Sequence, residues 1–263
     1  MNSDSELLTS EQPAIALLRQ LGYQHLSGAA LAAERPDIAQ VVLPQRLRAA
    51  IARLNPLLDA ANRQRAYDRV TAVPGASLME VNEGVWKLIR GNTGLSLNQE
   101  VAGQPTPLPI SYLDYRTPEN NEFLVVSQVK YHGQAGHSVP DLVVYVNGLP
   151  LAVLECKASG ARNAWGSAHS DLAFYQQNSA RLFHYNQLCV GIWGVGGRYG
   201  AIGTPPAFYS HFRADDEREL LALLAGRPPS AQDKLLFNLF RPDRPTSPSC
   251  ATSCCSSSMR AGW

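Results

Sequence analysis

Three ionisable residues that could do chemistry lie in one apolar stretch of the chain. Asp141, Glu155 and Lys157 occur within PDLVVYVNGLPLAVLECKAS, residues 140–159. Burial of charged groups is costly unless they are paired or bind a metal. Two converging carboxylates can hold Mg²⁺, which prefers one or two carboxylate ligands and keeps several waters. With a nearby lysine to position or activate the attacking water, this set of residues could hydrolyse a phosphodiester.

The turn between the two strands decides whether these residues converge. Alternate side chains share a face of a strand, so Glu155 and Lys157 point the same way. A two-residue turn at 147–148 would place Asp141 opposite Leu154, and Asp141 would face away from Glu155. A three-residue loop or a β-bulge would place Asp141 opposite Glu155. We therefore predict the longer loop or a bulge in this hairpin.

A simpler interpretation of the same residues needs no metal. Asp141 could cap a turn, and Glu155 and Lys157 could form an ion pair between strands. Residue spacing alone favours this interpretation, because Pro-Asp followed by Glu-x-Lys occurs often by chance. The cost of burying charge in an apolar hairpin favours the metal site instead.

The elements that must position these residues follow the order helices, strands, helix and strand. Helical spacing of apolar residues predicts helices at 11–23, at 44–73 with an interruption at Pro56, and at 77–91. Strand-like segments follow at 109–115, 122–132, 141–147 and 151–157. A helix over 168–183 and a buried strand at 187–194 complete the order. The sequence therefore predicts an α/β fold with a mixed sheet flanked by helices and a helical N-terminal region.

Composition argues against several classes of protein. The formal net charge of +1 gives no global basic field for nucleic acid or for an anionic membrane. No apolar run approaches the roughly 18 residues that span a bilayer, and the polar, acidic N-terminus is not a signal peptide. The cysteines lack the spacing of zinc ligands. We therefore expect a cytoplasmic protein without a membrane segment.

The glycine-rich segment GVGGRYGAIGT, residues 194–204, invites comparison with a phosphate-binding loop. It lacks G-x-x-x-x-G-K-[ST], and no helix clearly starts after it. We therefore expect this segment to be a mobile loop between strands. We expect no residues that bind an organic cofactor elsewhere in the chain either.

Four segments together resemble one known family. RLRAAIARLNP, EVNEGVWKLIRG, YLDYRTPENNEFLVVSQ and PDLVVYVNGLPLAVLECKAS, in this order and spacing, are similar to the N-terminal region of the restriction (R) subunit of type I restriction-modification enzymes. The resemblance covers roughly residues 10–245 and implies a PD-(D/E)xK nuclease domain that cuts DNA with Mg²⁺. It also implies that Asp141 and Glu155 are metal ligands and that Lys157 is the catalytic lysine.

The chain departs from this family at one position of a second motif. Members commonly carry Q-x-x-x-Y on the helix after the active-site strands. This chain has Tyr175 at the tyrosine position, where it is expected to support the site, but Asp171 replaces the glutamine. A carboxylate there could repel phosphate, or it could face solvent without effect.

The resemblance also implies partners and an organisation along the chain. Double-stranded DNA and the modification and specificity subunits are the expected partners. ATP belongs to the translocase of the full-length family subunit, and we expect no ATP site in this chain. We divide the chain into a helical part of the nuclease domain at 1–92, a nuclease core at 93–243, and an irregular tail at 244–263. The tail is rich in serine and cysteine and has no periodicity, so it is either disordered or the product of a reading-frame shift.

Three functional hypotheses follow. The first is a Mg²⁺-dependent endonuclease domain of a type I restriction system, truncated before its translocase. The second is a catalytically inactive remnant that keeps only subunit or DNA docking, which Asp171 and the tail favour. The third is an unrelated PD-(D/E)xK repair nuclease, which accounts for the three ionisable residues but not for the flanking motifs.

Overall fold

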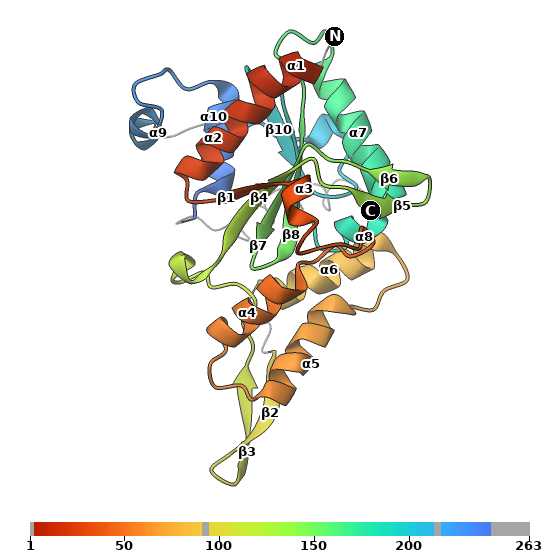
Figure 1. The fold of residues 1–263 in the computed structure, drawn as a ribbon, viewed down its shortest axis with the longest axis vertical. Helices are drawn as coiled ribbons and strands as arrows, with labels where there is room; N and C mark the ends of the chain where they lie inside the picture. The colour runs from red at the N-terminus through yellow and green to blue at the C-terminus, as the bar shows by residue number, and fades with distance from the viewer. Residues whose placement is uncertain (1–2, 91–94, 213–216, 243–263) are drawn as a thin grey trace.

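The computed structural model describes residues 3–90, 95–212 and 217–242 (Figure 1). Its centre is a mixed six-stranded sheet with the strand order β1-β4-β7-β8-β9-β10. The bounds are β1 Gln24–Ser27, β4 Phe123–Ser127, β7 Leu142–Val146, β8 Leu149–Cys156, β9 Leu188–Ile192 and β10 Gly197–Gly200. The pairs β1–β4 and β8–β9 are parallel and the other neighbours are antiparallel. The predicted α/β fold with a mixed sheet and helices is confirmed at this level.

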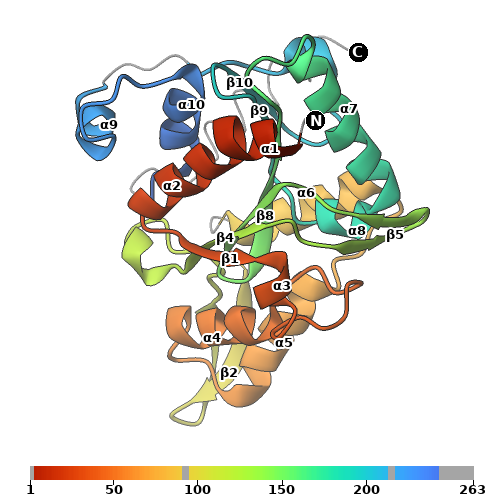
Figure 2. The ribbon, with the colours of Figure 1, turned by 45° about the horizontal axis from the view of Figure 1, so that its top comes forward.

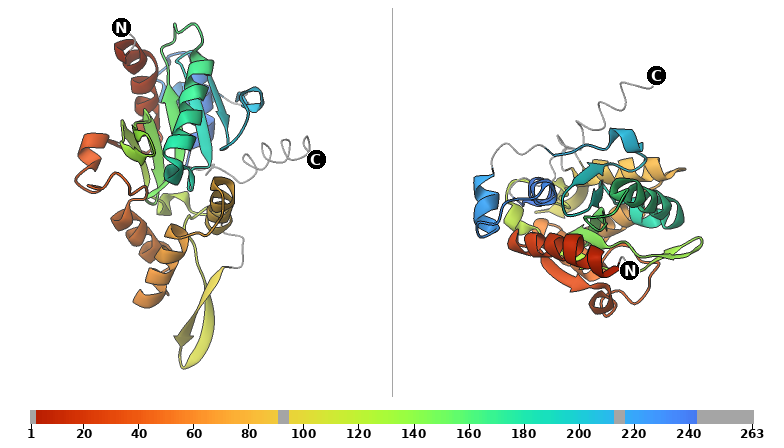
Figure 3. Two further views of the ribbon diagram at one scale, coloured as in Figure 1. Left: turned by 90° about the vertical axis from the view of Figure 1, so that its right-hand side faces the viewer. Right: turned by 90° about the horizontal axis from the view of Figure 1, so that it is seen from above.

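Helices cover both faces of this sheet (Figures 2 and 3). On one face, α2 (Gln12–Gln20) and α10 (Ala231–Phe240) pack against alternate residues such as Leu154 and Val190. On the other face, α7 (Ala164–Asn178) and α8 (Ala180–Phe183) pack against Val153 and its neighbours. Every residue of β8 is buried, because both of its faces are covered. The central hairpin therefore lies in the interior, as its apolar sequence indicates.

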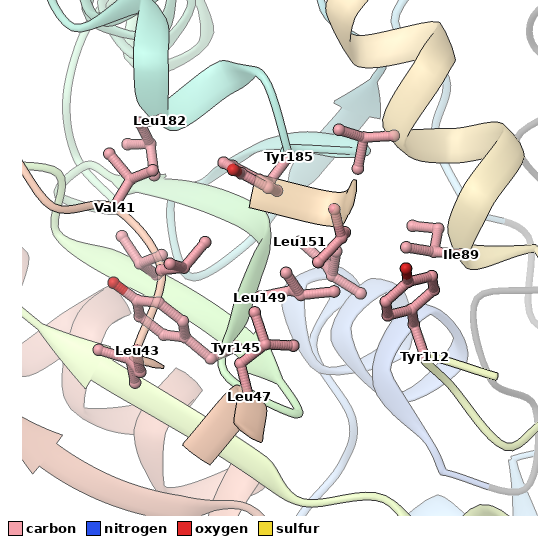
Figure 4. Packing of buried hydrophobic residues seen from close by; sticks show 14 of the residues in the cluster. Val41, Leu43, Leu47, Ile89, Tyr112, Tyr145, Leu149, Leu151, Leu182 and Tyr185 are labelled. Carbon is pink, nitrogen blue, oxygen red and sulfur yellow. The ribbon is translucent and has the colours of Figure 1, made fainter. Parts of the chain in front are cut away.

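The apolar core between the sheet and helices α7 and α8 also includes side chains of the helical N-terminal part. Helices α4 (Pro44–Leu54), α5 (Ala60–Thr71) and α6 (Leu78–Ile89) contribute apolar side chains to it. Figure 4 shows Leu47 of α4 beside Tyr145 and Leu149 of the hairpin, and Ile89 of α6 beside Tyr112. The predicted break at Pro56 is confirmed, because α4 and α5 are separate helices.

The remaining elements are short. They are α1 Ser3–Glu6, the π-helix η1 Leu7–Glu11, α3 Gly28–Leu31, β2 Ser96–Val101, β3 Gln104–Pro109, the 3-10 helices η2 Pro118–Asn120 and η3 Pro206–Phe208, β5 Tyr131–Gly133, β6 Gly136–Ser138 and α9 Arg218–Leu223. Strands β2 and β3 form a ribbon of their own, as do β5 and β6. No helix in the described part of the chain is both long and apolar enough to cross a membrane.

Several expectations about local structure were wrong. Residues 194–204 are not simply a loop, because Gly197–Gly200 form β10, the antiparallel neighbour of β9. Residues 110–115 contain no strand, whereas the earlier ribbon β2–β3 was not predicted. That ribbon is largely exposed and therefore lacks the alternating apolar pattern by which strands are recognised. The predicted tail at 244–263 lies outside the described residues.

Candidate functional site: two carboxylates and a lysine on the central hairpin

The hairpin that carries the candidate residues has a two-residue turn. Val146 pairs with Leu149, so Asn147 and Gly148 alone form the turn. Both have positive φ, 53° at Asn147 and 80° at Gly148, as a type I′ turn requires. Glycine is needed at the second position because a Cβ there would lie 2.7 Å from the backbone oxygen of Leu43. The three-residue loop that was one of our two expectations is therefore wrong.

A bulge further along the hairpin supplies the shift in register. Tyr145 pairs with Pro150, whereas Val144 pairs with Ala152. Leu151 is the extra residue on β8, so every pair beyond it is displaced by one position. The β-bulge that we predicted as the alternative to a longer loop is confirmed. Continuing the same register by one pair beyond Leu142–Leu154 places Asp141 opposite Glu155.

Buried hydrogen bonds fix the turn in its left-handed conformation. The Asn147 amide nitrogen donates to the carbonyl oxygen of Tyr112 at 2.9 Å and to Asn121 Oδ1 at 2.8 Å. Its Oδ1 accepts from the backbone N–H of Glu122 at 2.8 Å and from Arg53 at 3.0 Å. The side chain is fully buried, so all of its polar capacity is used inside the protein.

Asp141 is oriented by two donors. Its Oδ2 accepts a hydrogen bond from the backbone N–H of Cys156 at 2.7 Å, and its Oδ1 accepts one from Gln128 Nε2 at 3.0 Å. Burial raises the pKa of Asp141, although these two donors and the Lys157 ammonium oppose the change. The carboxylate is therefore held in one orientation while it remains poorly solvated.

Glu155 and Lys157 meet on the same face, as strand alternation predicts. Lys157 Nζ lies 2.7 Å from Glu155 Oε1. The other carboxylate oxygen, Oε2, is buried and accepts no hydrogen bond of ordinary geometry from the residues that the structure describes. Burial raises the pKa of Glu155 well above its usual value, and the charge of Asp141 raises it further. An unpartnered buried oxygen is costly in the protein alone, and a bound cation would relieve that cost.

Asp171 is part of the same group of charges. It lies on α7, and its Oδ2 is 2.8 Å from Lys157 Nζ. Burial lowers the pKa of Lys157, but Glu155 and Asp171 outweigh it, so the net shift is upward. Neither of our two expectations for Asp171, repulsion of phosphate or simple exposure to solvent, describes this ion pair. Asp171 and Glu155 hold the lysine ammonium between them.

Tyr175 lies one helical turn beyond Asp171 and also reaches the group. Its hydroxyl donates to the carbonyl oxygen of Val139, two residues before Asp141, at 3.4 Å. Burial raises the pKa of Tyr175, and the charges of Glu155, Asp141 and Asp171 raise it further. The structure therefore brings together all four residues that we predicted for the site, namely Asp141, Glu155, Lys157 and Tyr175.

Sequence analysis missed one acidic residue beside this group. Glu11, the last residue of η1, is buried, and Gln128 Nε2 donates to its Oε2 at 3.2 Å. Gln128 thus bridges Glu11 and Asp141. Burial raises the pKa of Glu11 to about 7, and the charge of Asp141 contributes. In the sequence Glu11 is the first residue of the helix predicted at 11–23, so no signal distinguished it as a site residue.

The two carboxylates suit one divalent cation with few protein ligands. Among the described residues, no group of three or more His, Cys, Asp or Glu side chains is arranged to hold a metal. Mg²⁺ does not require such a group, because it binds through one or two carboxylates and retains waters that a phosphate oxygen can replace. The free Oε2 of Glu155 and the oriented Asp141 fit this requirement.

Comparison with known proteins identifies a family and several relatives that this chain resembles. The family model of the type I restriction enzyme R protein N terminus matches residues 3–208. The chain is 27% identical over 221 residues to the type I restriction enzyme HindI endonuclease subunit of Haemophilus influenzae, a match that covers 81% of this chain and 21% of the relative. It is 26% identical over 252 residues to the "Putative type I restriction enzyme MjaIXP endonuclease subunit" of Methanocaldococcus jannaschii, covering 88% of this chain and 24% of the relative. The chain thus spans about a quarter or less of the length of these relatives.

Proposed function

This chain belongs to the family of the type I restriction enzyme R protein N terminus, and we propose that it is a Mg²⁺-dependent DNA endonuclease domain with a PD-(D/E)xK fold. The observation that carries the proposal is the convergence of Asp141, Glu155 and Lys157, with one Glu155 oxygen buried and unpartnered. The mixed sheet, with the two carboxylates on one hairpin at its centre, also supports it.

Each residue has a distinct part in the proposed phosphodiester hydrolysis. Asp141 and Glu155 would hold Mg²⁺, which when bound polarises the phosphate and neutralises the developing charge. The Cys156 N–H and Gln128 keep Asp141 in the orientation that this requires. The raised pKa of Lys157 keeps its ammonium protonated at neutral pH. Lys157, with its Nζ 2.7 Å from Glu155 Oε1, is placed to position or activate the attacking water and to contact a phosphate oxygen.

We propose double-stranded DNA as the substrate and the modification and specificity subunits of a type I system as partners, in the cytoplasm. The names of the relatives, which are endonuclease subunits of type I restriction enzymes, support this assignment.

One observation favours a second candidate function. Asp171 neutralises part of the charge that Lys157 would present to a phosphate. A chain in which this ion pair persists would dock to DNA or to other subunits without cutting. Because the Asp171 side chain is 41% exposed, water weakens its hold on the lysine, and we favour the active enzyme.

Plasmid cleavage tests the proposed function. Wild type with supercoiled plasmid and Mg²⁺ should produce nicked and linear DNA, and Asp141→Asn, Glu155→Gln and Lys157→Ala should each be slower by about 100-fold or more. Glu119→Gln is the matched control, because Glu119 is an exposed carboxylate on η2 away from this group. Equal cleavage by wild type and Asp141→Asn would refute the assignment, and plasmid binding without cleavage would support the docking function.

A further inference from the structure

A row of paired residues leads from Glu155 to an arginine on the edge strand. Glu155 pairs with Gly191 of β9, and Gly191 pairs with Arg198 of β10. Directly paired residues of neighbouring strands project from the same face of a sheet. Glu155 and Arg198 therefore share a face and are separated by two strand spacings, about 10 Å between Cα atoms.

A tryptophan occupies the space that glycine leaves in the middle of this row. A Cβ on Gly191 would lie 3.1 Å from Cζ3 of Trp165 and 3.1 Å from Cβ of Ala168. The guanidinium carbon of Arg198 lies 5.3 Å from the centre of the Trp165 ring. Trp165 belongs to α7, the helix that also carries Asp171 and Tyr175. The arginine and its tryptophan thus continue the candidate site along the sheet.

No carboxylate in the described part of the chain neutralises the charge of Arg198. Across residues 3–90, 95–212 and 217–242, no carboxylate lies within ion-pair distance of its guanidinium, and its Nε is buried without a hydrogen-bond partner. Lys157, in contrast, is held by two carboxylates. In the protein alone, the three carboxylates of Asp141, Glu155 and Asp171 face a single ammonium, that of Lys157. The net charge of this group is therefore negative and repels a DNA phosphate, so a further positive group close by would favour binding. Among the described residues, Arg198 is a cation on this face that no carboxylate holds.

We propose that Arg198, supported by Trp165, binds a DNA phosphodiester adjacent to the one that is cleaved. The proposal rests on the proposed nuclease function, because it places the scissile phosphate at Asp141 and Glu155. Two strand spacings separate Arg198 from Glu155, so the arginine would contact a neighbouring phosphate and not the one at Glu155. Its planar guanidinium can donate two hydrogen bonds to one phosphate while it remains stacked on the indole ring.

Duplex binding as a function of salt tests this subsite. The probe is a short fluorescein-labelled duplex, measured by anisotropy with Ca²⁺ in place of Mg²⁺. We expect Arg198→Gln to bind about ten-fold more weakly than wild type. The slope of log K against log salt should also fall by about 0.9, the change expected when one phosphate contact is lost. Arg198→Lys keeps the charge and should keep the slope.

Arg90 provides a matched control. Its guanidinium carbon lies 4.5 Å from the Trp86 ring centre, and its Nε is likewise buried and has no hydrogen-bond partner among the described residues. It follows α6, which carries Trp86 and packs against α8, whereas Trp165 lies on α7. Arg90→Gln should therefore bind the duplex as wild type does and with the same slope.

The outcomes separate this proposal from the nuclease function. If Arg198→Gln binds with wild-type affinity and slope, or if Arg90→Gln weakens binding equally, the subsite is wrong. Failure of wild type to bind the duplex also overturns it. The nuclease function is judged separately, by plasmid cleavage with wild type and Asp141→Asn. Arg198-dependent binding without any cleavage would keep Arg198 as a phosphate contact, but it would refute the nuclease and with it the placement of this contact beside a scissile phosphate.

Discussion

Gly28→Ala tests whether the backbone around Gln128 maintains the site. A Cβ at Gly28 would lie 2.2 Å from the Gln128 backbone oxygen, whereas ordinary contacts begin at 3.4 Å. The difference, 3.4 minus 2.2, means that the carbonyl must move by about 1 Å. Gln128 already has a left-handed backbone, with φ of 54°, and its N–H donates to the Asp141 carbonyl oxygen at 2.9 Å. Displacement of Gln128 should therefore displace Asp141 as well.

The expected cost has two parts. Overpacking against backbone should lower the free energy of unfolding by about 1–3 kcal/mol, which exceeds the gain of about 1 kcal/mol from replacing glycine in the short helix α3. A shift of about 1 Å at a catalytic group costs about 100-fold in rate. The assays are urea unfolding and plasmid cleavage with Mg²⁺ at a temperature where both proteins are folded.

Gly160→Ala is the control for this prediction. A Cβ at Gly160 meets no atom within 4 Å. Its free energy of unfolding should therefore equal that of wild type or exceed it slightly. Gly28→Ala with wild-type stability and wild-type cleavage would refute the view that Gln128 supports Asp141.

Three further predictions concern single side chains. The pKa of Glu11 is raised from 4.5 to about 7, so the folded state binds more protons and stability should fall between pH 4.5 and pH 7. Glu11→Gln should remove most of this pH dependence, measured as the difference in the free energy of urea unfolding between pH 5 and pH 8 in metal-free buffer; a variant as pH-dependent as wild type would contradict the burial of its charge. Asn147→Ala breaks all four hydrogen bonds of a fully buried side chain and should destabilise the protein by at least about 3 kcal/mol in urea. A loss under 1 kcal/mol, on the order of one hydrogen bond, would mean that the turn does not depend on them. Asp171→Asn should release Lys157 from one partner and increase the rate of plasmid cleavage, whereas a slower variant would show that the ion pair positions the lysine for catalysis.

The central hairpin could be predicted in detail from the sequence, because the proposed site requires the two carboxylates to converge and strand geometry allows this in few ways. Asn147-Gly148 is the strongest short signal for a two-residue turn, which by itself separates Asp141 from Glu155. The requirement that the two carboxylates converge left a longer loop or a bulge, and the bulge at Leu151 is present. Its position could not be predicted, since it depends on how Pro150 and Leu151 pack in the folded sheet.

Other features could not be predicted, for identifiable physical reasons. Strand β10 is half glycine, a composition typical of loops, and its pairing with β9 is a tertiary interaction. Arg198 was therefore read as a loop residue, although it lies in register with Glu155. Glu11 and Asp171 meet the site from two helices distant in sequence from the hairpin, and their contacts arise only when η1 and α7 both pack against β8.

Isothermal titration of Mn²⁺ into the metal-free protein tests the central claim, that Asp141 and Glu155 together hold a divalent cation. Wild type and the surface control Glu119→Gln should each bind an ion with the same affinity, and Asp141→Asn and Glu155→Gln should lose this binding while remaining folded by circular dichroism. A wild-type protein that binds no ion, or a Glu155→Gln variant that binds as tightly as wild type, would contradict the account.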